Sequence, residues 1–194
     1  MADLVIKPSS GNLVLKDDQN VARLTLATST GNTTFTGATT LANATITAGV
    51  FPAGHILQVV STTTDGVGDS ANVNSTSFVE VGLSATITPR ATSSKILIMV
   101  NTSVNVDDGS SVGESCYTGV KRGSTVLTAS VVGWDDGTTH NPSTCAFTYL
   151  DSPSTTSATV YEVVAKSNNV ALDWRMNAID AAEESSITLM EIAG

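Results

Sequence analysis

The sequence predicts an all-β protein, with a short N-terminal β fibre or shaft over residues 1–52 and an antiparallel, jelly-roll-like β-sandwich over residues 53–194. Hydroxyl side chains favour strands and turns over helices, and 29 Thr and 23 Ser occupy 52 of the 194 positions. Apolar residues recur at every second position in short runs, which is the period of a strand that buries one face. With 41% hydrophobic and 5% aromatic residues, the chain can form one domain with a modest core.

The N-terminal region consists of short apolar clusters that turn residues close. Strands are expected at residues 4–6, 13–15, 21–26, 33–36 and 39–47. Phe35 is the only aromatic residue before Phe51, so these strands cannot bury enough surface alone to offset the entropy of ordering the chain. The region therefore needs a partner, through self-association into a narrow β fibre or by packing on its own downstream domain. The third alternative is disorder.

From residue 54 onward, longer strands recur at the spacing of a sandwich or barrel. Nine are expected, at residues 55–60, 78–88, 95–101, 117–121, 125–132, 145–150, 158–166, 170–174 and 186–192. A helix of one or two turns is expected only at residues 179–184. The connections at residues 62–73, 106–113 and 135–142 are rich in Gly, Asp, Asn, Ser and Thr, which is typical of exposed loops.

The charge balance argues against two classes of partner. The chain has 18 Asp and Glu against 9 Lys and Arg, and its net charge of −9 repels phosphates and anionic lipid headgroups, so nucleic acid is not an expected partner. No membrane insertion is expected, because no run approaches about 18 apolar residues and the first seven residues do not resemble a signal peptide. Cys116 and Cys145 are expected to be buried and reduced.

Residues that could carry chemistry are sparse. His140 lies close to Ser143 and Cys145, but no nucleophile turn accompanies them, which favours a solvated loop histidine. Residues 65–69 offer oxygen atoms for a calcium ion, but they lack the spacing of an EF-hand and favour a flexible hairpin loop. No catalytic residue, metal or cofactor is expected, and the chain is not expected to be an enzyme.

Two loops form the expected receptor-facing surface. Asp107 and Asp108 lie in one loop, and Asp135 and Asp136 lie in another, where neighbouring side chains diverge instead of flanking a glycosidic bond. Trp134 is either a platform for a sugar ring or a partly buried aromatic at the rim. Trp174, in an alternating strand, is expected in the core. We therefore predict that the four aspartates and Trp134 face a host-surface glycan or protein.

Several motifs occur in an order that resembles a known class of protein. They are GHILQVVSTT at residues 54–63, GLSATITP at 82–89, SKILIMV at 94–100, VKRGS at 120–124, YLDSP at 149–153 and SITLMEI at 186–192, preceded by ADLVIK at 2–7, LVL at 13–15, ARLT at 22–25 and TFTG at 34–37. Together they resemble tailed-bacteriophage virion fibre proteins, especially those of marine and cyanobacterial phages. The resemblance implies a structural virion protein, usually a homotrimer, that serves as a tail fibre, a head fibre or a capsid decoration.

The residues themselves fit such an assembly. Three-fold symmetry would let three copies of the N-terminal segment combine their Leu and Val clusters in one shared interior. The leading hypothesis is a trimeric appendage assembled in the host cytoplasm, in which residues 1–52 trimerise and attach to other virion proteins, and the knob over residues 53–194 faces outward. The alternatives are a capsid head-fibre or decoration protein that stabilises the shell, a monomeric glycan-binding module, and a glycan depolymerase.

Overall fold

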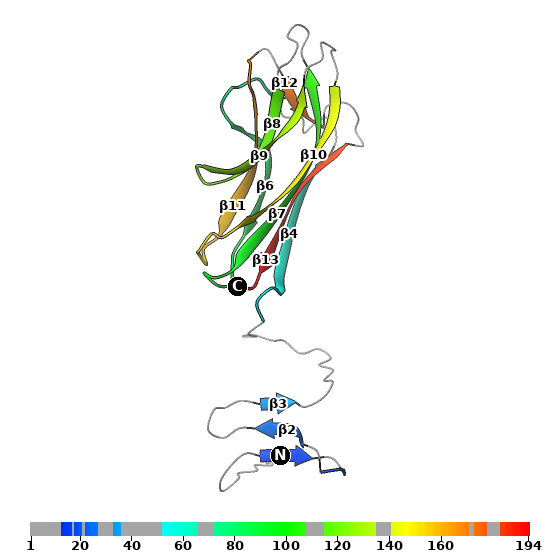
Figure 1. The fold of residues 1–194 in the computed structure, drawn as a ribbon, viewed down its shortest axis with the longest axis vertical. Helices are drawn as coiled ribbons and strands as arrows, with labels where there is room; N and C mark the ends of the chain where they lie inside the picture. Colours follow the sequence, from blue (N-terminus) through cyan, green and yellow to red (C-terminus); the bar gives the residue numbers. More distant parts are fainter. Residues whose placement is uncertain are drawn as a thin grey trace, which may run out of the picture. The chain divides into compact units, whose positions relative to one another are not determined.

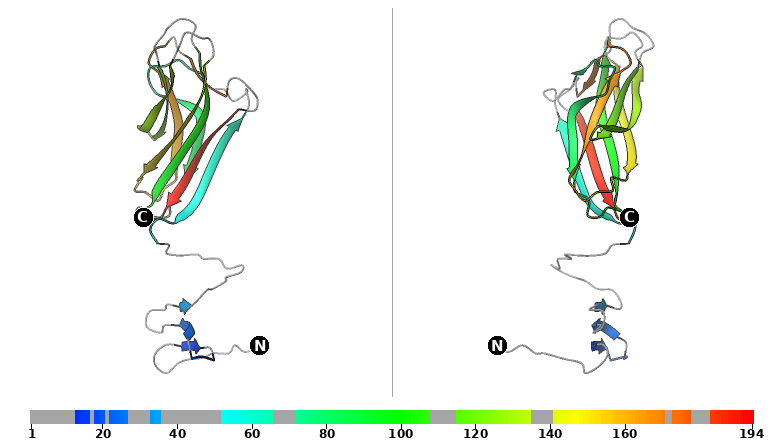
Figure 2. Two further views of the ribbon diagram at one scale, coloured as in Figure 1. Left: turned by 45° about the vertical axis from the view of Figure 1, so that its right-hand side comes forward. Right: turned by 90° about the vertical axis from the view of Figure 1, so that its left-hand side faces the viewer.

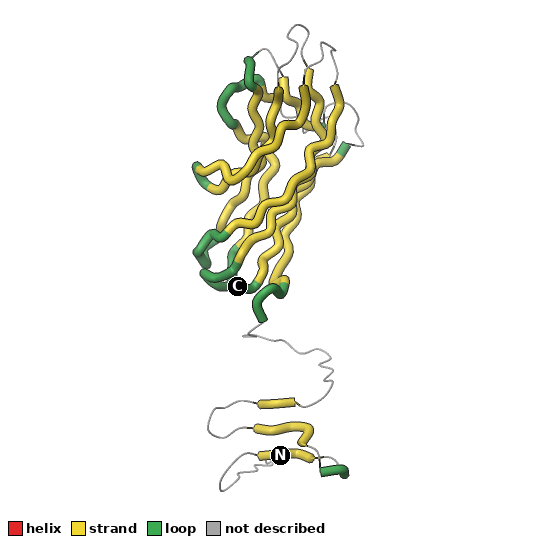
Figure 3. The backbone as a smooth tube through the Cα atoms, viewed as in Figure 1, coloured by secondary structure: helices red, strands yellow, loops and turns green. Residues whose placement is uncertain are grey.

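The protein divides into two compact units, Met1–Gly49 and Val50–Gly194. The computed structural model describes residues 13–16, 18–20, 22–26, 33–35, 52–65, 72–107, 115–134, 141–170, 173–177 and 183–194. Every regular element in these ranges is a β-strand, and all strand pairs are antiparallel (Figures 1 and 3). The predicted all-β fold class is confirmed.

The N-terminal unit contains a small sheet in the order β1-β2-β3, made of β1 (Leu13–Lys16), β2 (Ala22–Leu26) and β3 (Thr33–Phe35). These strands were predicted; the strands expected at residues 4–6 and 39–47 lie outside the described residues. At the turn after β1, Asn20 has a φ of 64° and accepts a hydrogen bond from Lys16 Nζ at 2.9 Å. None of the four β1 side chains is buried, and Leu15 is 51% exposed.

The second unit is a β-sandwich of two packed sheets (Figure 2). Its strands are β4 (Ile56–Asp65), β5 (Asn72–Val73), β6 (Val79–Ile87), β7 (Lys95–Asp107), β8 (Ser115–Arg122), β9 (Thr125–Trp134), β10 (Asn141–Asp151), β11 (Thr159–Ser167), β12 (Asp173–Met176) and β13 (Glu184–Ile192). One sheet has the order β6-β11-β8-β9, and the other the order β4-β13-β7-β12-β5 with β10 paired to β7. The long strand β7 pairs with β13 along its first half and with β12 along its second half, while β10 follows its opposite edge.

The core lies between the two sheets, where alternate side chains of each strand point inward. Leu83, Ile87 and Tyr161 of one sheet meet Ile98 and Leu189 of the other in a single apolar cluster. Cys116 and Cys145 are buried in this cluster and form no disulfide, as predicted.

Strands replace several segments that were expected to be loops. Residues 62–65 continue β4, residues 106–107 continue β7, and residues 141–142 begin β10. Asn72 and Val73 form β5, which was not expected. The β4 extension is a ladder in which residues 62–64 pair with residues 185–187 of β13. Pairing with a distant strand therefore decides the structure of these polar segments, whose β-branched Thr residues fit a strand well.

The prediction of a short helix at residues 179–184 is wrong for residues 183 and 184, the two that the structure describes. Glu184 is the first residue of β13 and pairs with Asp65, and Glu183 is not helical. Residues 179–182 lie outside the described part of the chain. Glu184 joins the sheet because β4 offers it a backbone partner, which outweighs the local preference of a short acidic segment for helix.

Both ends of the sandwich chain lie at one end of the sandwich (Figures 1 and 2). Gly54 N donates to Ala193 O at 2.8 Å, and Ala193 N donates to His55 O at 2.8 Å. The opposite end carries the last residues of β7 and β9 and the first residues of β8 and β10. We call it the loop end.

Candidate functional site

The strands that carry the predicted receptor-facing residues end side by side. Asp107 is the last residue of β7, and Trp134 is the last residue of β9. Their neighbours touch, because a Cβ atom on Gly133 would lie only 3.1 Å from Val106 Cγ2. The structure therefore brings the two predicted loops to the same end of the sandwich.

The receptor-facing residues themselves are largely outside the described part of the protein. Asp107 and Trp134 are described by their backbones only, and Asp108, Asp135 and Asp136 are not described. Receptor contact through these residues therefore stays a prediction.

Trp174 joins the two sheets near the loop end. Its side chain is fully buried, which confirms its predicted place in the core. The indole Nε1 of Trp174, on β12, donates to Thr118 Oγ1 of β8 at 2.9 Å. This hydrogen bond crosses the core, so the ring fixes the distance between the sheets as well as filling space.

A buried amide ties three strands of the larger sheet together close by. Asn177 has a φ of 51° and is fully buried. Its Nδ2 donates to Thr64 Oγ1 at 2.8 Å, and its Oδ1 accepts from Ser185 Oγ at 2.7 Å. Ser185 Oγ in turn accepts from the backbone N of Ser103 at 3.0 Å. The network links β4, β13 and β7, and a satisfied buried network of this kind specifies one arrangement of the strands.

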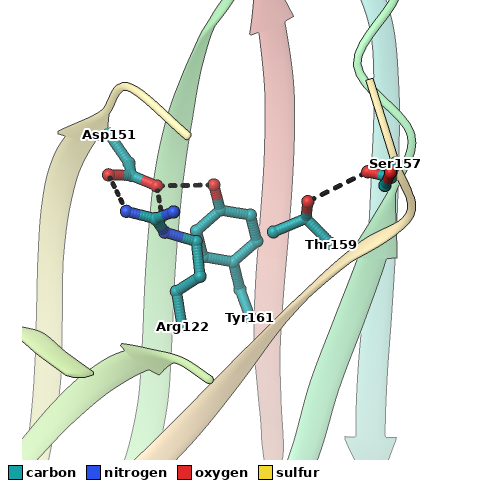
Figure 4. A network of polar contacts seen from close by, with 5 residues as sticks. All are labelled: Arg122, Asp151, Ser157, Thr159 and Tyr161. Atoms are coloured by element: carbon teal, nitrogen blue, oxygen red, sulfur yellow. Dashed lines mark hydrogen bonds and ion pairs between the residues drawn. The ribbon is translucent and has the colours of Figure 1, made fainter. Parts of the chain in front are cut away.

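A partly buried ion pair joins the two sheets through the buried Asp151 of β10 (Figure 4). Its Oδ2 accepts from Tyr161 Oη at 2.7 Å and lies 2.9 Å from Arg122 Nε. Tyr161 and Arg122 both belong to the smaller sheet. Burial, the hydrogen bond to Asp151 and repulsion from its charge raise the pKa of Tyr161 well above the ordinary tyrosine range, although Arg122 opposes the shift. The hydroxyl is therefore held as a proton donor.

A second buried carboxylate, Glu191, holds the connection between β6 and β7. It accepts hydrogen bonds at 2.6 Å from Ser94 Oγ, from the backbone N of Arg90 and from Gln58 Nε2. Burial raises the pKa of Glu191, but these hydrogen bonds outweigh it and the net shift is downward. The charged carboxylate is thus fully provided with donors, as a buried charge requires.

The outer face of the smaller sheet is charged. Lys121 forms ion pairs with Glu80 and, at 3.2 Å, with Glu162. Lys166 Nζ lies 5.1 Å from the centre of the Phe78 ring and 5.0 Å from that of Tyr117. These contacts are local, and they give this face a hydrated, ionic character.

The outer face of the larger sheet is largely uncharged and partly apolar. Strand register places side chains on it in rows across β4, β13, β7 and β10. The first row is Val59, Met190, Leu97 and Leu150, and the second is Ser61, Thr188, Met99 and Thr148. A hollow of about 400 Å³ lies on the same face, between Met99, Ala146 and Thr188. We call this surface the neutral face.

The described residues contain no cluster of three or more His, Cys, Asp or Glu side chains that could hold a metal ion. His140, the candidate for catalysis, and residues 66–69 of the candidate calcium loop lie outside those residues. No helix in the described ranges is long and apolar enough to cross a membrane.

No protein-family model matches the chain, and no curated protein matches it at significant similarity. Among solved structures, the chain is similar to one in the structure of infectious bursal disease virus, Gx strain, with 11% sequence identity and a TM-score of 0.36. That match covers 75% of this chain and 46% of the other, so the chain spans less than half of it. A likeness this distant does not establish a shared function.

Sequence reasoning missed the neutral face, although a signal was present. Residues 96–100 are all apolar, whereas a strand with one solvated face alternates apolar and polar residues. Met190 and Glu191 carry a second signal, since strict alternation from Ile187 and Leu189 turns the glutamate inward and the methionine outward. Both strands thus carry apolar side chains on both faces.

Proposed function

We propose that the protein is a non-enzymatic structural component of a virion, a homotrimeric fibre or appendage of a tailed phage. Residues 1–52 join the copies and attach them to other virion proteins, and the sandwich presents its loop end outward. The resemblance of its motifs to those of phage fibre proteins supports the virion setting.

One observation carries the proposal most directly. The first strand of the N-terminal unit buries none of its side chains within one chain, and Leu15 is half exposed. A sheet of strands only four, five and three residues long needs a covered apolar face to be stable in water. Association of three copies covers such side chains and the exposed strand edges together.

The arrangement of the sandwich fits a presenting role. The segments before β4 and after β13 lie together at one end of the sandwich, so the loop end is the part of the sandwich furthest from them. Three loop ends on one particle would convert weak single contacts into avidity, provided that the spacing of receptors matches.

Two measurements test the proposal. Light scattering of the full chain over a range of concentrations is expected to give three times the monomer mass of 19.9 kDa. Deleting the gene from the phage that encodes it is expected to leave filled heads that no longer adsorb to the host. A full chain that stays monomeric at every concentration contradicts the trimer. Normal adsorption by particles whose shells have become fragile would instead identify a capsid decoration protein.

A further inference from the structure

The neutral face is an unpartnered sheet surface with unusual composition for an exterior. Val59 is 54% exposed, Leu150 47% and Met99 40%. A third row, of Ile56, Ile192 and Lys95, lies beside the row of Val59 and Leu150. Contiguous exposed apolar surface of this kind marks an interaction site more often than isolated apolar residues do.

Charge is what separates this face from the rest of the molecule. We define the face by four rows, the three already named and a last row of Thr63, Ser186, Asn101 and Ala146. The next row toward the loop end, in which Glu184 pairs with Asp65, is acidic and lies outside it. Within these rows Lys95 alone is charged. The outer face of the smaller sheet instead carries Glu80, Lys121 and Glu162 among its scattered exposed valines.

From this contrast we infer that the neutral face packs against the same face of further copies of this chain, an inference that rests on the trimer of the proposed function. Each copy carries a net charge of −9, so copies repel one another least where they meet without charges. Depletion of charge and enrichment of methionine are properties of the centres of protein interfaces. A strongly basic partner, which the net charge would attract, finds no carboxylate in these rows.

The size of the face sets how much of each contact it supplies. Four strands about 4.8 Å apart and four rows about 6.8 Å apart cover about 500 Å² in projection. Each partner in a standard interface buries about 800 Å². Shared between the two neighbours in a trimer, the neutral face supplies about 250 Å² to each contact, about a third of a standard interface. The N-terminal unit supplies contacts of its own.

The native methionines report whether the face is covered. Met99 and Met190 lie on it, whereas Met176 is fully buried in the core and serves as an internal standard. Hydrogen peroxide oxidises methionine according to exposure. In the assembled full chain, mass spectrometry is expected to show Met99 oxidised about tenfold more slowly than in the Val59→Glu variant.

Two charge insertions form a matched pair. Val59 and Val131 are both valines on edge strands, 54% and 51% exposed, but Val131 is opposite Tyr117 on the smaller sheet. Val59→Glu should expose Met99 to oxidation, and Val131→Glu should leave it protected. Leu150→Glu, on the far edge of the neutral face, should repeat the effect of Val59→Glu. Slow oxidation of Met176 in every variant checks that the sandwich stays folded.

The outcomes separate this inference from the proposed function. A trimeric wild type with rapidly oxidised Met99 refutes the covered face but leaves the trimer standing. Equal effects of Val59→Glu and Val131→Glu also refute it, because the contact is then not specific to one face. A monomeric wild type overturns the trimer and this inference together.

Discussion

The hydroxyl of Tyr161 offers the most direct test of the ion pair between the sheets. Replacing Tyr161 with Phe removes the donor 2.7 Å from Asp151 Oδ2 and leaves Arg122 beside the carboxylate. A hydrogen bond to a charged group contributes about 1.5–3 kcal/mol. Because Tyr161 is fully buried and Asp151 nearly so, we expect the free energy of unfolding to fall by about 2 kcal/mol at pH 7.

Alkaline pH gives a second, independent readout of the same contact. The unfolded chain ionises this hydroxyl near pH 10, whereas the raised pKa of Tyr161 keeps it protonated in the folded protein. Above pH 10 the folded state therefore binds one more proton than the unfolded state, and stability falls by up to about 1.4 kcal/mol per pH unit. Between pH 10 and 11.5, wild type should lose about 2 kcal/mol from this group that Tyr161→Phe does not lose.

Urea unfolding followed by circular dichroism, at one protein concentration, measures both effects. The matched control is Tyr117→Phe, since the Tyr117 hydroxyl accepts a neutral hydrogen bond from Ser115 Oγ at 3.2 Å. This change should cost about 1 kcal/mol or less. The reasoning is refuted if the two Phe variants lose equal stability, or if the gap between wild type and Tyr161→Phe stays constant from pH 7 to 11.5.

Three further changes test the other buried polar groups by urea unfolding. Glu191→Gln should cost about 2–3 kcal/mol at pH 7. The folded pKa of Glu191 is lowered, so its contribution to the free energy of unfolding is present above the unfolded pKa near 4.3 and disappears as pH falls through the folded pKa. The stability of Glu191→Gln should therefore depend less on pH in acid than that of wild type. Identical acid profiles would contradict this. Trp174→Phe should cost about 3 kcal/mol, because it leaves a cavity and removes the partner of the Thr118 hydroxyl; a loss below that of an exposed-site control would be inconsistent with the cross-link. Asn177→Ala should be about 1 kcal/mol less stable than Asn177→Gly, since both lose the amide but only Ala is strained at positive φ; equal stability would remove the backbone argument.

The fold was largely predictable because apolar residues alternate with polar ones along many of the sandwich strands. Alternation from Val81 to Ile87 places every second side chain in the core, and the structure buries those positions. The strand ends were not predictable from local sequence. Thr62, Thr63 and Thr64 have the composition of a loop, and only their ladder with β13, more than a hundred positions later in the chain, makes them a strand.

The buried polar groups were not predictable, because each depends on partners from distant parts of the sequence. Asp151 meets Arg122 from 29 positions away, and Glu191 meets Gln58 from 133 positions away. Without knowledge of those donors, the sequence predicts that a carboxylate in a strand faces solvent. The predicted receptor-facing surface requires that β7 and β9 end side by side, and the close approach of Gly133 to Val106 supports that placement of the strand ends.

The neutral face and the loop end divide the sandwich along its length. The row nearest the chain ends contains Ile56 and Ile192, the next is wholly apolar, and the last contains Thr63, Ser186 and Asn101. Apolar content therefore declines toward the loop end, so copies that meet through this face would bury most apolar surface near the chain ends of the sandwich and least near the loop end. Since the Asn177 network and the Trp174 cross-link fix the strand ends from within, these strand ends do not depend on contact between copies for their position. A rigid frame of strands is the arrangement in which loop sequence can change binding without changing assembly.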